Sequence, residues 1–134
     1  MERLRVLLAD DNDILLDEVR AILEPKFDVV GEVGDGQALL EAARRLTPDV
    51  LVVDISMPGV SGIEAARELQ REGSSSKIVF LAVHHDLALV EIAFEAGGLG
   101  YVLKTSAGED LLPAIDEVLR GRRYVSPLLR VETP

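Results

Sequence analysis

Residues 50–55 read VLVVDI, an apolar run interrupted only by the acid Asp54. A run this continuous lacks the alternation of a strand with one face in water, so it predicts a strand buried on both faces. A carboxylate in such a strand is costly to bury unless a partner compensates its charge. The stretch therefore predicts the middle of a sheet and, at Asp54, a candidate functional residue.

Short apolar runs and amphipathic helical patterns alternate along the whole chain. The predicted strands are Leu4–Ala9, Val29–Val33, Val50–Ile55, Ile78–Val83 and Tyr101–Lys104. The predicted helices are Ile14–Glu24, Gln37–Leu46, Gly62–Arg71, Leu87–Ala96 and Gly108–Leu119. This alternation predicts an α/β fold with a doubly wound parallel sheet. Ligands of such sheets bind beyond the carboxyl ends of the strands.

Capping signals mark the starts of two of these helices. Ser61 with Glu64, and Ser106 with Glu109, have the spacing of a capping box. Pro113 does not fit, because proline inside a helix costs about 3 kcal/mol. Either the last helix starts later than its capping box suggests, or it kinks at this residue.

The composition favours a single compact domain that does not bind nucleic acid directly. The chain has 134 residues, no cysteine and a formal net charge of −10. Its largest basic cluster, Arg120 with Arg122 and Arg123, is typical of a solvated helix end rather than of a phosphate-binding stripe. The apolar run at the N-terminus is too short for a signal peptide or a membrane span. We expect a cytoplasmic protein that does not contact a membrane.

Charged residues stand at the carboxyl ends of three predicted strands. Asp10 and Asp11 follow the first strand, the third runs into Asp54, and the fifth ends at Lys104. The three carboxylates would repel one another, and a divalent cation resolves that repulsion. Clustered oxygen ligands suit Mg²⁺, which completes its coordination with waters and phosphate oxygens. An aspartate beside a metal and a lysine can act as a nucleophile toward phosphorus.

The sequence resembles the receiver domain of bacterial two-component response regulators. The matching stretches are LLADDN at 7–12, VVDISMPGVSG at 52–62 and GYVLK at 100–104, with Lys104 lying 50 residues after Asp54. The likeness extends from Leu4 to about Pro127. It implies a flavodoxin-like sheet of five strands in the order 2-1-3-4-5 with five flanking helices.

The resemblance also implies a role for each matching residue. Asp54 would accept a phosphoryl group from a phosphohistidine on a sensor histidine kinase, so the domain would be a signalling module rather than an enzyme acting on a separate substrate. Lys104 would contact the phosphoryl oxygens. Asp10, Asp11 and Asp54 would hold Mg²⁺ together with the backbone carbonyl of Ser56.

Two further positions belong to the switch that reports phosphorylation in such domains. Tyr101 matches the aromatic switch residue. Ala82, which lies 22 residues before Lys104, departs from the family pattern, because receivers usually carry Thr or Ser there. The missing hydroxyl removes a hydrogen bond of the kind worth about 1.5–3 kcal/mol with a charged partner. We expect phosphoryl acceptance to persist and the coupling to Tyr101 to weaken.

The C-terminal stretch resembles the closing helix of receivers of the NarL/FixJ group. The expected organisation is a receiver at residues 1–127 and the start of a linker or tail at 128–134. A helix-turn-helix domain absent from this chain would then contact DNA and control transcription. A stand-alone receiver that serves a phosphorelay is the alternative. A second copy of the chain is a further expected partner.

Other function classes fit the residues less well. A hydrolase of the haloacid dehalogenase type needs a second acid two residues after its nucleophile, where this chain has Ser56. A flavin carrier of the same fold would need a flavin site, which an aromatic content of 4% argues against. A pseudo-receiver that acts purely as a binding module would lack the acceptor or the acidic pair, and both are present, but Ala82 keeps this reading as part of the alternative. His84 and His85 are adjacent and favour a loop over a transition-metal site.

Overall fold

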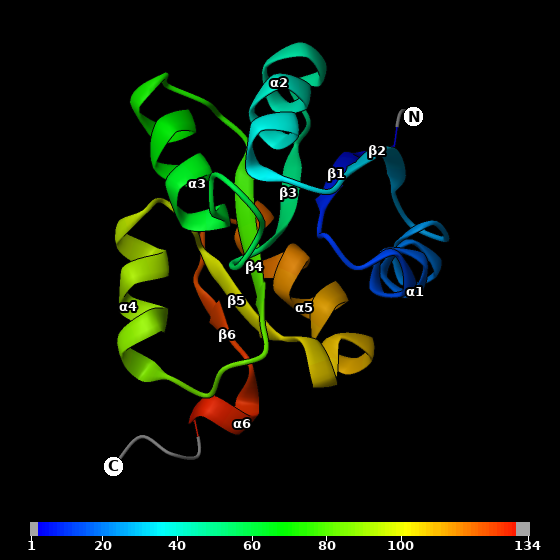
Figure 1. The fold of residues 1–134 in the computed structure, drawn as a ribbon. Coiled ribbons are helices and arrows are strands. Elements are labelled where there is room, and N and C mark those ends of the chain that lie inside the picture. The colour runs from blue at the N-terminus through cyan, green and yellow to red at the C-terminus, as the bar shows by residue number, and fades with distance from the viewer. Residues whose placement is uncertain (1–2, 131–134) are drawn as a thin grey trace.

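The computed structural model describes residues 3–130 as a parallel β-sheet with helices on both faces (Figure 1). The strands are β1 (Arg5–Ala9), β2 (Asp28–Val33), β3 (Val50–Asp54), β4 (Lys77–Ala82), β5 (Gly100–Leu103) and β6 (Tyr124–Val125). The helices are α1 (Asp13–Leu23), α2 (Gly36–Leu46), α3 (Gly62–Arg71), α4 (Leu87–Glu95), α5 (Ala107–Leu119) and α6 (Pro127–Arg130), with a 3-10 turn, η1 (Lys104–Ser106).

The sheet confirms the predicted order and extends it by one strand. The observed order is β2-β1-β3-β4-β5-β6, in which the first five strands follow the expected 2-1-3-4-5. The prediction of five strands and five helices was wrong, because β6 pairs in parallel with β5 and α6 follows it. β6 is two residues long, and so short a strand has no periodicity for a pattern to detect. The tail predicted at 128–134 begins inside α6, and residues 131–134 lie outside the described residues.

Successive residues of each strand point to opposite faces and build two cores. Helices α2, α3 and α4 cover one face, where their apolar side chains pack on strand residues such as Leu51 and Phe80. Helices α1 and α5 cover the other face, against residues such as Val52 and Leu81. Figure 1 shows these two helical layers around the sheet. The continuous apolar run of β3 follows from this arrangement, since both of its faces are covered.

Side chains cap several helices, although one predicted capping box does not form. The hydroxyl of Ser61 accepts a hydrogen bond from the Glu64 N–H at 3.2 Å, as predicted for the start of α3. The predicted box at Ser106 was wrong, because this hydroxyl donates to the Asp110 carboxylate at 2.7 Å instead of accepting from the backbone of α5. α5 starts at Ala107 and continues through Pro113, which excludes the later start considered for this helix.

The strand order reverses where β1 lies between β2 and β3, and the carboxyl ends of β1 and β3 meet at that point. This is the position at which doubly wound sheets bind ligands. None of the helices within residues 3–130 is both long enough and apolar enough to cross a bilayer.

Candidate functional site

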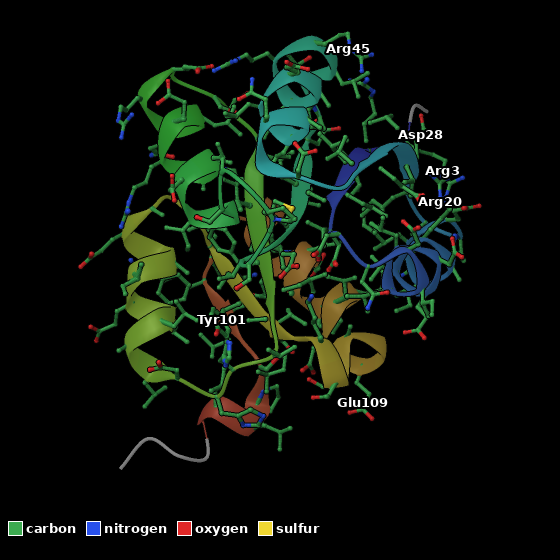
Figure 2. All side chains as sticks on the ribbon, in the orientation of Figure 1. Arg3, Arg20, Asp28, Arg45, Tyr101 and Glu109 are labelled. Carbon is green, nitrogen blue, oxygen red and sulfur yellow. The ribbon has the colours of Figure 1, made fainter. Side chains whose placement is uncertain are left out.

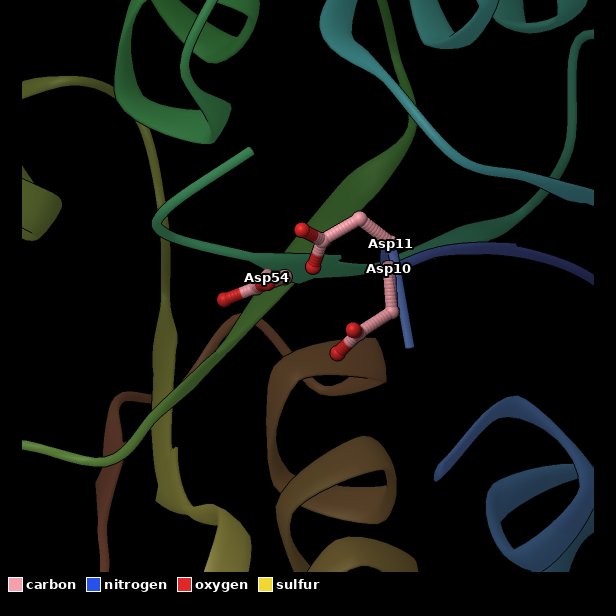
Figure 3. Close-up of side chains that lie close together, drawn as sticks. All are labelled: Asp10, Asp11 and Asp54. Atoms are coloured by element: carbon pink, nitrogen blue, oxygen red, sulfur yellow. The ribbon is translucent and has the colours of Figure 1, made fainter. Parts of the chain in front are cut away.

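Three carboxylates meet at the carboxyl ends of β1 and β3. One oxygen from each of Asp10, Asp11 and Asp54 lies within 4.8 Å of the others. Figure 3 shows the three side chains gathered around a common space at this edge of the sheet. Asp10 and Asp54 are 1% and 4% exposed, whereas Asp11 is exposed to solvent. The arrangement joins two buried acids with one acid that solvent reaches.

The turn from β1 into α1 holds Asp10. Its Oδ1 accepts a hydrogen bond from the Asn12 N–H at 2.9 Å, while the Asn12 side chain caps α1 by accepting from Ile14 and Leu15. Its Oδ2 lies 3.0 Å from the Nζ of Lys104 but receives no aligned hydrogen bond from the described residues. Asp10 therefore presents one buried oxygen that is ion-paired with Lys104 but lacks a well-aligned hydrogen bond.

Asp54 ends β3 and shares the same lysine. Its Oδ2 lies 3.2 Å from the Lys104 Nζ, and its Oδ1 accepts a hydrogen bond from the Ser56 N–H at 3.1 Å. Lys104 is the first residue of η1, directly after β5, so its side chain reaches across the end of β4 toward β1 and β3. One ammonium group thus bridges the two buried acids.

Two glycines shape the loop between Asp54 and α3. Gly59 has a φ of +71°, a left-handed conformation that glycine adopts without strain. A Cβ at Gly62 would lie 2.1 Å from the carbonyl oxygen of Asp54, so only glycine lets α3 start this close to β3. Both constraints hold the loop against the carboxylate cluster.

The electrostatics of the site reflect burial and an excess of acids. Burial raises the pKa of Asp54, and the charge of Asp10 raises it further, although Lys104 opposes both effects. Burial tends to lower the pKa of Lys104, but its contacts with Asp10 and Asp54 outweigh this effect and raise it. One lysine therefore does not fully compensate two buried carboxylates.

The residues present fit a divalent cation. Three carboxylates against one ammonium leave a formal excess of two negative charges (3 − 1 = 2). The Asp10 Oδ2, which lacks an aligned hydrogen bond, belongs to this cluster of acids. Hard oxygen ligands are those that Mg²⁺ and Ca²⁺ prefer. This acidic group could hold a metal ion. Ser56 lies in the adjoining loop, and its carbonyl as a further ligand stays a prediction.

The two predicted switch positions lie beside the site on β4 and β5. Ala82 ends β4 and is buried, with only a methyl group to offer. Tyr101 is completely buried between the sheet and α4 (Figure 2), and its hydroxyl donates a hydrogen bond to the His84 carbonyl at 3.0 Å. Burial, followed by the charge of Asp86, raises the pKa of Tyr101 to about 12. The aromatic side chain is thus tied to the loop that leads into α4.

Sequence reasoning missed one residue that shapes the turn around Asp10, and it predicted that two histidines are ordinary loop residues. Asn12 was overlooked, although an asparagine just before a helical pattern is a helix-cap signal that could have identified it. His84 and His85 are exposed and lie in the loop between β4 and α4, as expected.

Comparison with known proteins assigns the family. The family model of the response regulator receiver domain matches residues 6–116. The response regulator UvrY of Escherichia coli K12 is 36% identical over 125 residues, which make up 92% of this chain and 57% of UvrY. The transcriptional regulatory protein DegU of Brevibacillus brevis is 33% identical over 127 residues, 93% of this chain and 54% of DegU. The chain spans slightly more than half the length of these relatives.

Solved structures agree with this assignment. A two-component response regulator of the LuxR family from Aurantimonas sp. SI85-9A1 has a TM-score of 0.91 and 36% identity, covering 98% of this chain and 95% of that one. The receiver domain of NarL from Mycobacterium tuberculosis has a TM-score of 0.86 and 30% identity, covering 91% and 100%. Response regulator receivers are signalling domains and are not classical enzymes. The chain therefore belongs to the response regulator receiver domains and is related to those of the NarL and LuxR type.

Proposed function

We propose that this receiver accepts a phosphoryl group on Asp54 from the phosphohistidine of a sensor histidine kinase. The observation that carries the proposal is the bridging position of Lys104, whose Nζ lies 3.2 Å from Asp54 and 3.0 Å from Asp10. An ammonium beside the acceptor carboxylate can offset the charge of the incoming phosphoryl oxygens. The family assignment supports the same reading.

The proposed transfer is a displacement at phosphorus. An oxygen of Asp54 forms a bond to phosphorus while the P–N bond of the phosphohistidine breaks, and the bonding electron pair leaves on the imidazole nitrogen. Phosphoryl transfer depends mainly on positioning and charge compensation. The Ser56 N–H, 3.1 Å from Asp54 Oδ1, orients the carboxylate for this step.

The proposal includes Mg²⁺, held by Asp10, Asp11, Asp54 and the carbonyl of Ser56. When bound, the ion would supply positive charge toward the phosphoryl oxygens and favour the ionised form of the acceptor. Asp11 is exposed, which suits a ligand that an ion entering from solvent meets first.

Transcription control belongs to the same proposal. The chain covers only part of relatives that are named as transcriptional regulators, and we propose that a helix-turn-helix domain follows the receiver of residues 1–127 through a linker at 128–134. The whole protein would act in the cytoplasm, where the kinase phosphorylates its own histidine. A second copy of the chain is a proposed partner, supported by the exposed apolar residues Leu87 and Ile92 on α4.

Intact-mass measurement after incubation with acetyl phosphate and Mg²⁺ tests the acceptor. We expect a single phosphoryl adduct on the wild type and none on Asp54→Asn. Asp17→Asn, which removes an exposed acid on α1, is the matched control and should be modified like the wild type. An adduct on Asp54→Asn, or none on any of the three proteins, would contradict the proposal.

Ala82 supports a second proposal, that phosphorylation is coupled only weakly to Tyr101. A methyl group at the buried end of β4 cannot donate a hydrogen bond to a phosphoryl oxygen. Addition of beryllofluoride and Mg²⁺ should therefore shift amide NMR signals near Asp54 strongly and those near Tyr101 and α4 only slightly. Large shifts at both places would refute the weakened coupling. Weak coupling would also be compatible with the alternative function, a stand-alone receiver or a binding module.

A further inference from the structure

Two buried polar residues lie outside the carboxylate cluster. Among residues 3–130, the polar or charged residues that are buried are Asp10, Asp54, Asp110 and Ser126. The first two belong to the site described above. Asp110 is 6% exposed and Ser126 is 0% exposed, and both lie on the β6 side of Lys104. Buried polar groups are normally retained only where hydrogen bonds compensate their desolvation, so their partners indicate what they hold in place.

Ser126 holds the residue that precedes Lys104. The Ser126 N–H donates to the Tyr101 carbonyl at 3.0 Å, as the parallel ladder between β5 and β6 requires. If the ladder continued, the Leu103 N–H would donate next to the Ser126 carbonyl. That carbonyl instead accepts from Leu129 in α6, and the Ser126 hydroxyl takes its place, accepting from the Leu103 N–H at 3.0 Å. A side chain thus completes the strand at its last residue.

Asp110 ties the other side of Lys104 to the same strand. Its Oδ2 accepts a hydrogen bond from the Ser106 hydroxyl at 2.7 Å, and Ser106 is the last residue of η1. Its Oδ1 accepts from the Tyr124 hydroxyl of β6 at 3.2 Å. One buried carboxylate therefore joins η1, α5 and β6. Lys104 lies between these two points of attachment, with Leu103 on one side and Ser106 on the other.

We propose that Ser126 is a positioning residue for Lys104, and that Asp110 supports it from the far side of η1. The lysine side chain has several rotatable bonds, and a fixed backbone position reduces the conformations that must be ordered before Nζ can reach Asp10 and Asp54 together. The inference deepens the proposed phosphoryl transfer and rests on it for its chemical meaning. It also connects the acceptor site directly to β6 and α6, by a route that does not pass through Ala82.

This connection acts in both directions. A hydrogen bond that holds Lys104 in place for the phosphoryl group is, by thermodynamic linkage, tightened when Lys104 engages that group. Ligation at the site should therefore be felt at Ser126 and at the start of α6, which leads to the C-terminal end of the chain.

The first test uses the full chain without metal or phosphate. The chain has three lysines, Lys26, Lys77 and Lys104, so the Cε–Hε signal of Lys104 in carbon–proton NMR is readily assigned with Lys104→Arg. We expect Ser126→Ala to shift this signal. Ser126→Thr, which keeps the hydroxyl, should leave it near its wild-type position.

Two further variants serve as a milder probe and as a control. Tyr124→Phe removes the hydroxyl that donates to Asp110 and should shift the Lys104 signal less, in the same direction. Ser76→Ala removes a hydroxyl that donates to the Pro48 carbonyl at 2.6 Å. Ser76 lies just before β4, at the amino-terminal ends of the strands and so away from Lys104. Ser76→Ala should not move the signal. A Lys104 signal that stays unchanged in folded Ser126→Ala, or that moves equally in Ser76→Ala, would overturn the inference.

The second test separates positioning from overall stability. With acetyl phosphate, Ser126→Ala should be phosphorylated about tenfold more slowly, since small misplacements of a catalytic group carry penalties of this order. Its Mg²⁺ affinity should stay within about twofold of the wild type, because the acids that would bind the ion remain in place. Ser126→Thr should recover most of the rate. A parallel loss of Mg²⁺ affinity would indicate general disruption and contradict a positioning role.

The two tests keep the inference distinct from the proposed function. If the wild type is never phosphorylated, the proposed function fails, and the metal-free NMR measurement still decides whether Ser126 positions Lys104. If the wild type is phosphorylated and Ser126→Ala matches it in both rate and Lys104 signal, only the present inference fails.

Discussion

β5 leads directly into Lys104 and lies between β4 and β6, which make different contacts with its last residue. On one side, Ala82 of β4 lies opposite Leu103 and offers only a methyl group, which is buried in the core on the side of α2, α3 and α4. On the other side, Ser126 follows β6 and accepts the Leu103 N–H at 3.0 Å, in a position where Ser126 is fully buried. The two neighbours thus differ by one hydroxyl group next to the same strand.

Of the two strands that flank β5, the β6 side therefore supplies a polar side chain to the backbone just before Lys104, and β4 does not. β6, the strand that pattern analysis could not detect, supplies Tyr124 and is followed directly by Ser126, whereas β4 contributes backbone hydrogen bonds and apolar packing at this point. The family pattern of Thr or Ser at the position of Ala82 would instead place a hydroxyl toward the phosphoryl group from the β4 side. In this chain the β6 side has a hydroxyl that holds Leu103, whereas the β4 side lacks the hydroxyl expected of the switch.

The largest expected effect on stability comes from removing the buried side chain of α6 that holds β6 in place. Leu129 of α6 is completely buried in the core under α4, so Leu129→Ala should lower the free energy of unfolding by about 2–5 kcal/mol. The neighbouring Leu128 is 52% exposed, and Leu128→Ala should stay within about 0.5 kcal/mol of the wild type. Urea unfolding measures both, and equal values would show that α6 does not anchor β6.

The next effect concerns pH and the buried phenol beside β4. Burial and Asp86 raise the pKa of Tyr101 from 10.0 to about 12, so folding favours its neutral form. This contribution is complete below pH 10 and is lost as the pH rises from 10 toward 12, by roughly 2–3 kcal/mol in total. Alkaline titration of tyrosinate absorbance should show a phenol that ionises late and that disappears in Tyr101→Phe. Ionisation of both tyrosines near pH 10 would contradict this prediction.

Adding the missing hydroxyl on the β4 side should have a smaller and conditional effect. Ala82→Ser introduces a buried hydroxyl and should cost about 1–2 kcal/mol without a phosphoryl group. With beryllofluoride and Mg²⁺ part of this loss should be recovered, because the hydroxyl gains a partner. Ala93→Ser in α4 buries a hydroxyl at a site that is 0% exposed and should show no recovery. Calorimetric unfolding with and without beryllofluoride distinguishes the two variants.

The smallest effect concerns a contact that joins the two sides. The guanidinium of Arg123, just before β6, lies 4.5 Å from the ring centroid of Phe94 in α4. Arg123→Ala should cost about 0.5–1 kcal/mol, as expected for a cation–π contact at an exposed site. Arg123→Lys should retain part of this stabilisation in thermal unfolding, and a full loss in both variants would indicate that packing of the long side chain matters more than charge.

The sequence predicted the elements whose signal is local and missed those whose signal is distant. The run at 50–55 predicts β3 because its composition alone shows that both faces are buried. Asp10, Asp11, Asp54 and Lys104 stand at the ends of such runs, and parallel strands bring those ends together, so their proximity could be predicted. Their roles in phosphoryl transfer stay predictions.

The parts that were missed depend on partners far along the chain. Ser126 matters because of Leu103, 23 residues earlier, and nothing near Ser126 shows that this N–H lacks a ladder acceptor. The capping box at Ser106 was mispredicted for a related reason. Its hydroxyl has a choice between the helix backbone and Asp110, and the buried carboxylate is the stronger acceptor.

The brevity of β6 has a consequence for self-association. β5 is apolar and fully buried, and without β6 its backbone groups would form an open edge that templates pairing with another chain. β6 covers this edge with two residues, and the following Ser126 and Pro127 turn the chain away, so the new edge is too short and interrupted to recruit a further strand. A chain that ends before Tyr124 should therefore form oligomers in light scattering at concentrations where the complete receiver does not.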